Sequence, residues 1–214
     1  MAERFTDIDA LVTRLPALRD AGPSITGATA AIIRALRAGG SLFACGNGGS
    51  ASDAEHMVGE LVKSFELPRP VSPDVRAGLE RRYGEDGADL ADRLQTGLRA
   101  VSLVSSVAAA SAIANDQGAD LVYAQQLLAL ARPGDLLVGF STSGTSASVV
   151  AALRVASVLE MTTVLVTGQR VPHRARALAT FVIAAPEAAT APVQEYHLAI
   201  YHAICKAVER ELFG

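Results

Sequence analysis

Two side chains that could bind a metal ion or transfer a proton, His56 and Glu60, lie four residues apart in the first third of the chain. This spacing places both on one face of a helix. A histidine nitrogen and a carboxylate are common zinc ligands, and the same pair can act as acid and base. An ordinary surface ion pair has the same spacing, and is the better interpretation unless further ligands exist elsewhere.

A glycine-rich turn, Gly46–Ser50 (GNGGS), directly precedes this helix and follows an apolar run at 41–45. Glycines let backbone N–H groups approach an anion, and the start of a helix adds positive potential. The spacing matches neither a dinucleotide-binding GxGxxG motif nor a P-loop, because no Gly-Lys-Ser/Thr follows. By itself the turn predicts an anion site and a plain strand-to-helix connection equally well.

A second polar turn, Ser141–Ser146 (STSGTS), has the same position between an apolar run and a helix. Its hydroxyl groups surround one glycine at the expected helix N-terminus. A phosphate monoester is bound well by several neutral donors together with a helix dipole. A serine-rich helix cap is the alternative, but a cap needs only one hydroxyl. The turn therefore favours a phosphate site.

Gln194 and His202 are further candidate ligands on the last helix, which is otherwise apolar. Eight residues of helix separate their Cα atoms by about 12 Å. Both side chains can bind one ion only under one of three conditions. The ion lies between them along the helix so that they approach it from above and below, the helix begins after Gln194, or one of the two residues comes from a neighbouring subunit. A core histidine is the alternative interpretation of His202. We interpret His173 and His197 as structural or surface residues.

Apolar runs alternate with helical patterns along the chain, which predicts an α/β fold with a parallel sheet and helices on both faces. The expected strands lie at 41–45, 98–104, 135–140, 162–166 and 181–184, and the expected helices at 8–36 (with a break at Gly22-Pro23), 50–65, 108–114, 121–131, 147–159, 174–179 and 192–212. In such sheets ligands bind at the carboxyl ends of the strands, where both polar turns fall.

Length and composition are those of one domain. The chain has 214 residues, is 50% hydrophobic and carries a net charge of −3. We expect a single domain over 1–214, with an N-terminal helical region at 1–39 and an exposed inserted loop at 78–94 that contains at most a short helix at 88–94. The absence of a basic run argues against nucleic-acid binding.

No apolar run reaches the roughly twenty residues that span a bilayer. Cys45 and Cys205, which lack CxxC spacing, indicate buried packing residues in a cytoplasmic protein.

Four motifs in this order resemble the phosphoheptose isomerases: GNGGSxSDAxHxxxEL from Gly46, AND at 114–116, STSGTS at 141–146 and QExHxxxxH from Gln194. The resemblance runs from about Gly40 to the C-terminus. Members of this family are sugar-isomerase (SIS) domains, three-layer αβα sandwiches with a five-stranded, flavodoxin-like parallel sheet. They convert sedoheptulose 7-phosphate to D-glycero-D-manno-heptose 7-phosphate, the first step of heptose biosynthesis, by proton transfer through a cis-enediol.

The resemblance also implies roles for individual residues. Glu60 and His202 correspond to the acid–base pair, and the ligands of one Zn²⁺ per subunit correspond to His56, Glu60, Gln194 and His202. Asp53 matches a family aspartate beside the site. Family members are homotetramers with active sites at subunit interfaces. The substrate-binding positions correspond to Asn47, Gly48, Gly49, Glu60, Asn115, Asp116, Ser141, Thr142, Ser143, Ser146 and Gln194.

The sequence departs from the family pattern in three places. Ala51 stands where many members carry His, Gly59 replaces an acidic residue, and the 78–94 segment is an insertion that could change which sugar fits. Two other functions share the fold: a non-catalytic SIS protein that associates with a replication initiator, and a regulatory domain that senses a sugar phosphate. The non-catalytic relatives lack the equivalents of Glu60 and His202, and a sensor would not need the metal ligands, so an enzyme is favoured.

Overall fold

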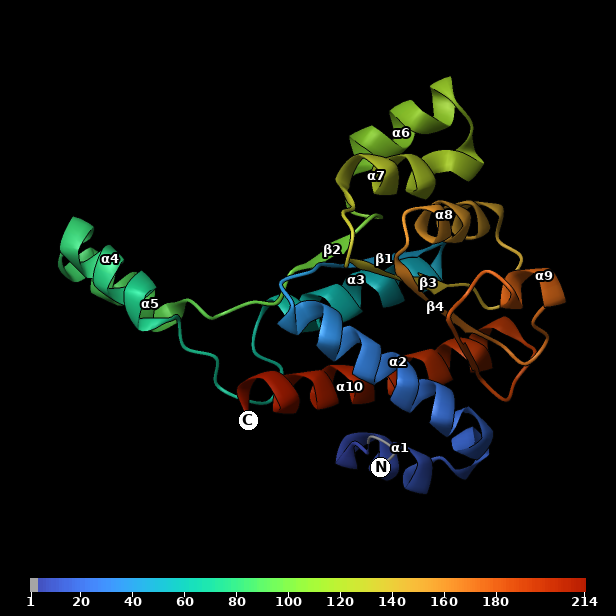
Figure 1. Cartoon of the computed structure of the whole chain (residues 1–214), viewed down its shortest axis with the longest axis horizontal. Helices are drawn as coiled ribbons and strands as arrows, with labels where there is room; N and C mark the ends of the chain where they lie inside the picture. Colours follow the sequence, from blue (N-terminus) through green and yellow to red (C-terminus); the bar gives the residue numbers. More distant parts are fainter. Residues whose placement is uncertain (1–3) are drawn as a thin grey trace.

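The computed structural model describes residues 4–214, and within them the chain forms one parallel sheet of five strands in the order β2-β1-β3-β4-β5 (Figure 1). This is the flavodoxin-like strand order. The predicted α/β class and parallel sheet are confirmed. The strands are β1 (Leu42–Gly46), β2 (Ala100–Ser102), β3 (Leu136–Phe140), β4 (Thr162–Thr167) and β5 (Phe181–Ala184).

The central strands are buried on both faces, and alternate residues face opposite sides. In β1, Leu42 and Ala44 belong to one apolar cluster, whereas Phe43 and Cys45 belong to the other. This is the two-residue period of a strand. The first cluster is covered by α1 (Thr6–Arg14), α2 (Gly22–Arg37), α3 (Gly49–Val62) and α10 (Thr190–Phe213), and the second by α7 (Val122–Leu130), α8 (Ala147–Val158) and α9 (His173–Arg176) (Figure 1).

Three short elements complete the two helical layers. A 3₁₀ turn, Pro16–Ala21, joins α1 to α2, and Pro23 lies in the first turn of α2. The predicted boundary at Gly22-Pro23 is therefore the start of a helix. Helix α6 (Val107–Asp116) packs on α7 through a second 3₁₀ turn, Ala119–Leu121. Within residues 4–214, no helix is both long and apolar enough to cross a bilayer.

The segment predicted as an exposed inserted loop at 78–94 is largely exposed, and the short helix predicted at 88–94 is present, but the rest of the segment is not a loop: it belongs to a helical hairpin. Helix α4 (Pro73–Tyr83) is capped by the Ser72 hydroxyl, and α5 (Glu85–Arg93) follows after Gly84. The hairpin extends away from the sheet (Figure 1). Neither helix has a long apolar face: caps and i,i+4 ion pairs support them instead. Hydrophobic periodicity therefore gave no signal for α4.

A buried ion pair fastens the chain after α3 onto α10. The Arg69 and Glu209 side chains are almost completely buried, and Arg69 Nε donates to Glu209 Oε1 over 2.7 Å. The carboxylate also accepts hydrogen bonds from three consecutive backbone N–H groups, at 65–67. Burial raises the pKa of Glu209, but these hydrogen bonds and Arg69 outweigh burial, and the net shift is downward.

We predict that Glu209→Ala lowers the free energy of unfolding by about 3–5 kcal/mol, because it leaves a buried guanidinium and three N–H groups unpaired. Urea unfolding measures the loss. Glu211→Ala, which breaks an exposed pair with Arg37, is the matched control and should cost less than about 1 kcal/mol. Since the pKa of Glu209 is lowered in the folded state, its contribution is present above its unfolded pKa and is lost as pH falls through the folded value. A variant as stable as the control would contradict this role.

Candidate active site

The two polar turns meet at the carboxyl edge of the sheet because β1 and β3 are neighbours. One side chain joins them: Asn47 Nδ2 donates to Ser146 Oγ over 2.6 Å and to Ser148 Oγ over 2.9 Å. Gly48, between β1 and α3, has φ = +57°, a conformation that favours glycine. The chain thus reverses tightly enough to bring the start of α3 beside the second turn.

A pocket of about 120 Å³ lies between the turns, lined by Asn47, Ser50, Phe140, Ser141, Thr142, Ser143 and Ser146. Ser146 occupies the N-cap position of α8 but makes no cap hydrogen bond, so its hydroxyl is not used as a cap. Gly144 has φ = +66°, and Ser143 Oγ and Thr145 Oγ1 are 2.7 Å apart. The pocket offers several neutral donors and the N-terminus of a twelve-residue helix, which suits an anion.

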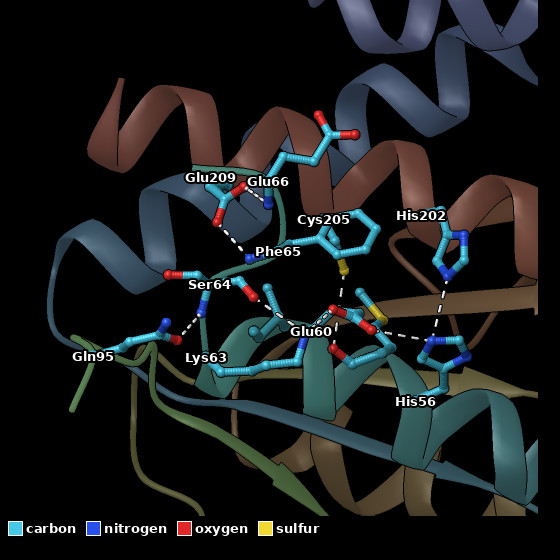
Figure 2. Close-up of polar contacts among 12 residues, drawn as sticks. His56, Glu60, Lys63, Ser64, Phe65, Glu66, Gln95, His202, Cys205 and Glu209 are labelled. Atoms are coloured by element: carbon cyan, nitrogen blue, oxygen red, sulfur yellow. Dashed lines mark hydrogen bonds and ion pairs between the residues drawn. The ribbon is translucent and has the colours of Figure 1, made fainter. Parts of the chain in front are cut away.

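The predicted acid–base residues come together between α3 and α10 (Figure 2). His56 Nε2 lies 3.1 Å from Glu60 Oε1 and 3.4 Å from His202 Nε2. Glu60 is 9% exposed, and the His56 side chain is 44% exposed. Burial, and then the neighbouring His56, lowers the pKa of His202. A shielded carboxylate and a histidine that favours its neutral form are groups that can take part in proton transfer.

The same three side chains have the chemistry of zinc ligands. A tetrahedral ion with donors at about 2.0–2.1 Å keeps those donors about 3.3 Å from one another. The two contacts of His56, with Glu60 and His202, are near that value. However, no group of three His, Cys, Asp or Glu side chains within residues 4–214 is arranged to hold a metal ion as it stands. Both contacts involve His56 Nε2, so ion binding would require the three donors to turn toward a common point.

Two residues of this cluster were not predicted from the sequence. The Tyr201 hydroxyl lies 2.8 Å from His56 Nδ1, where its hydrogen bond can orient the imidazole, as happens to histidines that bind metals. Lys63 Nζ donates to Glu60 Oε2 over 2.5 Å (Figure 2). Burial raises the pKa of Tyr201, so its phenol stays protonated. A tyrosine within an apolar helix stripe was the available signal for Tyr201.

Gln194 lies apart from the other three predicted metal ligands. Helices α3 and α10 run in the same direction: Gly49 faces Gln194, and seven residues further along His56 faces Tyr201. A Cβ at Gly49 would lie 2.3 Å from Gln194 Nε2, so the Gln194 amide keeps this position only when residue 49 is glycine. Within one chain, Gln194 therefore lies near the glycine turn, about 12 Å along α10 from His202.

Asp53 and His197 form a buried pair between these two places. The Asp53 Oδ2 to His197 Nδ1 distance is 3.7 Å, and neither atom has a hydrogen-bond partner within residues 4–214. The His197 ring packs against Phe140, whose centroid is 5.8 Å away. Of the two interpretations we gave His197, the structural one is therefore correct. Cys45 and Cys205 are buried and free, as expected.

Asn115 and Asp116 lie at the exposed end of α6, where their side chains hydrogen-bond to each other over 2.8 Å. Neither lines the pocket between the two polar turns. Helix α6 is almost entirely apolar in sequence, yet none of its residues is buried, and Val107 is 78% exposed. One chain thus does not bring these two predicted substrate-binding residues to the rest of the site.

Comparison with known proteins agrees with this geometry. The family model for the SIS domain matches residues 6–83 and 85–168. The phosphoheptose isomerase of Shewanella oneidensis is 33% identical over 217 residues, which cover 100% of this chain and 97% of that protein. The chain belongs to the SIS domain family. Within this family it is an isomerase of the phosphoheptose isomerase group.

Two further members of the group are similar over most of their length. The phosphoheptose isomerase of Akkermansia muciniphila is 37% identical over 179 residues, covering 84% of this chain and 80% of that protein. The solved structure of the phosphoheptose isomerase from Neisseria gonorrhoeae superposes with a TM-score of 0.71 and 29% identity, over 94% of this chain and 96% of that one. The SIS fold of this chain is thus shown by sequence and structure alike.

We predict that Gly49→Ala lowers kcat/KM at least tenfold while the protein remains folded, because the new methyl group displaces the Gln194 amide. A steady-state isomerase assay and a thermal melt measure the two effects. Gly59→Ala on the same helix is the matched control, since its Cβ would meet no atom within 4 Å. It should keep full activity and gain about 0.5–1 kcal/mol of stability. Equal activity of the two variants would contradict a role for the Gly49–Gln194 contact.

Proposed function

We propose that the chain converts sedoheptulose 7-phosphate to D-glycero-D-manno-heptose 7-phosphate, the first step of heptose biosynthesis. One observation carries the proposal: an anion-binding pocket and an acid–base cluster lie along the same helix, α3. Gly49 and His56 are separated by seven residues, or about 10 Å of helix, on the scale of an extended seven-carbon sugar phosphate. The phosphate would bind at Ser141–Ser146, and the carbonyl end would reach Glu60 and His202.

The reaction moves one carbon-bound proton and one oxygen-bound proton. Glu60 removes a proton from C1 of the ketose and returns it to C2, and His202 carries a proton between O1 and O2. Glu60 can do this because its carboxylate is shielded, with one oxygen towards His56 and the other towards Lys63. Binding of the distant phosphate supplies energy that places the carbonyl end.

A zinc ion, one per subunit, belongs to this proposal. His56, Glu60 and His202 would hold it, and Gln194 would need to come from another subunit or from a rearranged helix start. When bound, zinc supplies a Lewis acid that favours negative charge on the sugar oxygens. The proximity of the three donors and their His and Glu chemistry support it.

We further propose a cytoplasmic homotetramer whose active sites lie at subunit interfaces. The exposed apolar surface of α6 supports an interface there, since monomers rarely leave such a helix uncovered. Asn115 and Asp116 at its end would then reach the sugar bound by another subunit. The free, buried thiols of Cys45 and Cys205 fit a reducing compartment.

The proposed reaction is tested by incubating the protein with sedoheptulose 7-phosphate and assaying the aldose product. We predict that Glu60→Gln and His202→Asn each lower kcat at least a thousandfold with unchanged thermal melts, because each removes a group that transfers a proton. Glu55→Gln, on the exposed side of the same helix, is the control and should remain active. Near-normal turnover of either variant would disprove its assignment, and an inactive wild-type protein would disprove the reaction.

Metal content is measured on the same proteins by mass spectrometry. We expect about one zinc per chain in the wild type, loss of the ion in His56→Ala, and loss of turnover when a chelator is added. Full activity of a protein free of metal would contradict the zinc proposal and leave the acid–base assignment intact.

Light scattering coupled to size exclusion tests the assembly. We predict a tetramer for the wild type, and dissociation with loss of activity for Val107→Glu, which places a charge on the apolar surface of α6. Val158→Glu, at an equally exposed valine on α8, is the control and should remain tetrameric. A wild-type monomer with full activity would contradict the assembly.

A further inference from the structure

Tyr123 is a buried residue on α7 that contacts the polar turn after β1. Its phenol oxygen lies 2.5 Å from the Gly46 carbonyl oxygen and 3.0 Å from Asn47 Oδ1. Both neighbours are acceptors, so the phenol is the donor and its single proton is shared between them. Burial raises the pKa of Tyr123 to about 12, so this proton is retained at neutral pH.

The Asn47 amide connects the Tyr123 hydroxyl to the proposed phosphate pocket. Its oxygen accepts from Tyr123, and its nitrogen donates to Ser146 Oγ and Ser148 Oγ. Both ends of the amide are therefore held by the protein. Asn47 links the turn after β1 to the turn after β3, and Tyr123 fixes the orientation in which it does so.

The hydrogen bond from Asn47 determines whether the Ser146 hydroxyl can donate a hydrogen bond to a ligand. A hydroxyl that accepts a hydrogen bond on its oxygen still has its proton to donate. The neighbouring Ser148 Oγ is 3.4 Å away, too far for a strong bond. Ser146 lines the pocket, and a ligand oxygen at a shorter distance can replace Ser148 as the acceptor of its proton. Such a group favours a phosphate oxygen over a sugar hydroxyl that must donate.

We propose that Tyr123 is a positioning residue for the phosphate pocket: through Asn47 it fixes Ser146 as a hydrogen-bond donor to the phosphate. The chain of donors runs from the phenol to the amide, from the amide to the serine, and from the serine to the ligand. Each bond polarises the next, which strengthens the last one. The inference rests on the proposed phosphate site and assigns residues behind it that set its preference for an anion.

Two measurements test this inference. Calorimetric titration with inorganic phosphate gives the phosphate affinity of the protein, and steady-state kinetics give KM and kcat. We expect Tyr123→Phe to bind phosphate about tenfold more weakly, the value of one ordinary hydrogen bond. KM for the phosphorylated ketose should rise by the same factor, whereas kcat should change less than about twofold. A purely structural effect would instead lower the melting temperature and kcat together. Tyr83→Phe, at an exposed tyrosine on α4, is the matched control and should match the wild type.

Asn47→Asp keeps the shape of the side chain and its bond from Tyr123, but a carboxylate cannot donate. Ser146 must then donate to residue 47, and phosphate affinity should fall about a hundredfold, since a charge also enters the pocket. Phosphate binding by Tyr123→Phe or Asn47→Asp within twofold of the wild type would overturn the inference and leave the proposed reaction standing. A wild-type protein that binds no phosphate would overturn the proposed phosphate site itself.

Discussion

The close packing of α3 against α10 is the constraint on which the site depends. The two helices run in the same direction, and at their start the Gln194 amide packs directly on Gly49, where a larger residue would displace it. Two turns further along, the same packing sets His56 between Tyr201 and His202. The buried Arg69–Glu209 pair fastens the chain that follows α3 onto α10. A small displacement of either helix would therefore separate the acid–base residues.

The sheet supplies the second half of the site in a different way. Neighbouring parallel strands end at one edge, and both β1 and β3 are followed by a polar turn and a helix N-terminus. Asn47 connects the two turns, and Tyr123 holds Asn47 from the opposite helical layer. The proposed phosphate pocket is thus shaped by both faces of the sheet, whereas the His56–Glu60–His202 cluster belongs to one face. The proposed reaction would separate phosphate binding and proton transfer along α3, as an extended sugar phosphate requires.

The sequence predicted those parts of the molecule whose signals are local. The strand at Leu136–Phe140 was found because a short apolar run between turn residues indicates a buried strand. Helix α4 was missed because its stability comes from a cap and charge pairs rather than from an apolar face. His56, Glu60 and His202 were predicted as one cluster from motifs at opposite ends of the chain, and they do meet. Tyr123 could not be predicted, because its role depends on a contact with residue 47 that only the folded sheet creates.

The central claim is that phosphate and carbonyl ends of one sugar bind at opposite ends of α3. A crystal structure of Glu60→Gln with sedoheptulose 7-phosphate, recorded with zinc anomalous scattering, tests it most directly. We predict phosphate density between Ser141 and Ser146, and the carbonyl end beside His202 together with the zinc signal. A second pocket next to His202 is lined by Arg14 and Lys206, which could also attract an anion. Phosphate density in that pocket, with the sugar chain pointing away from α3, would contradict the account.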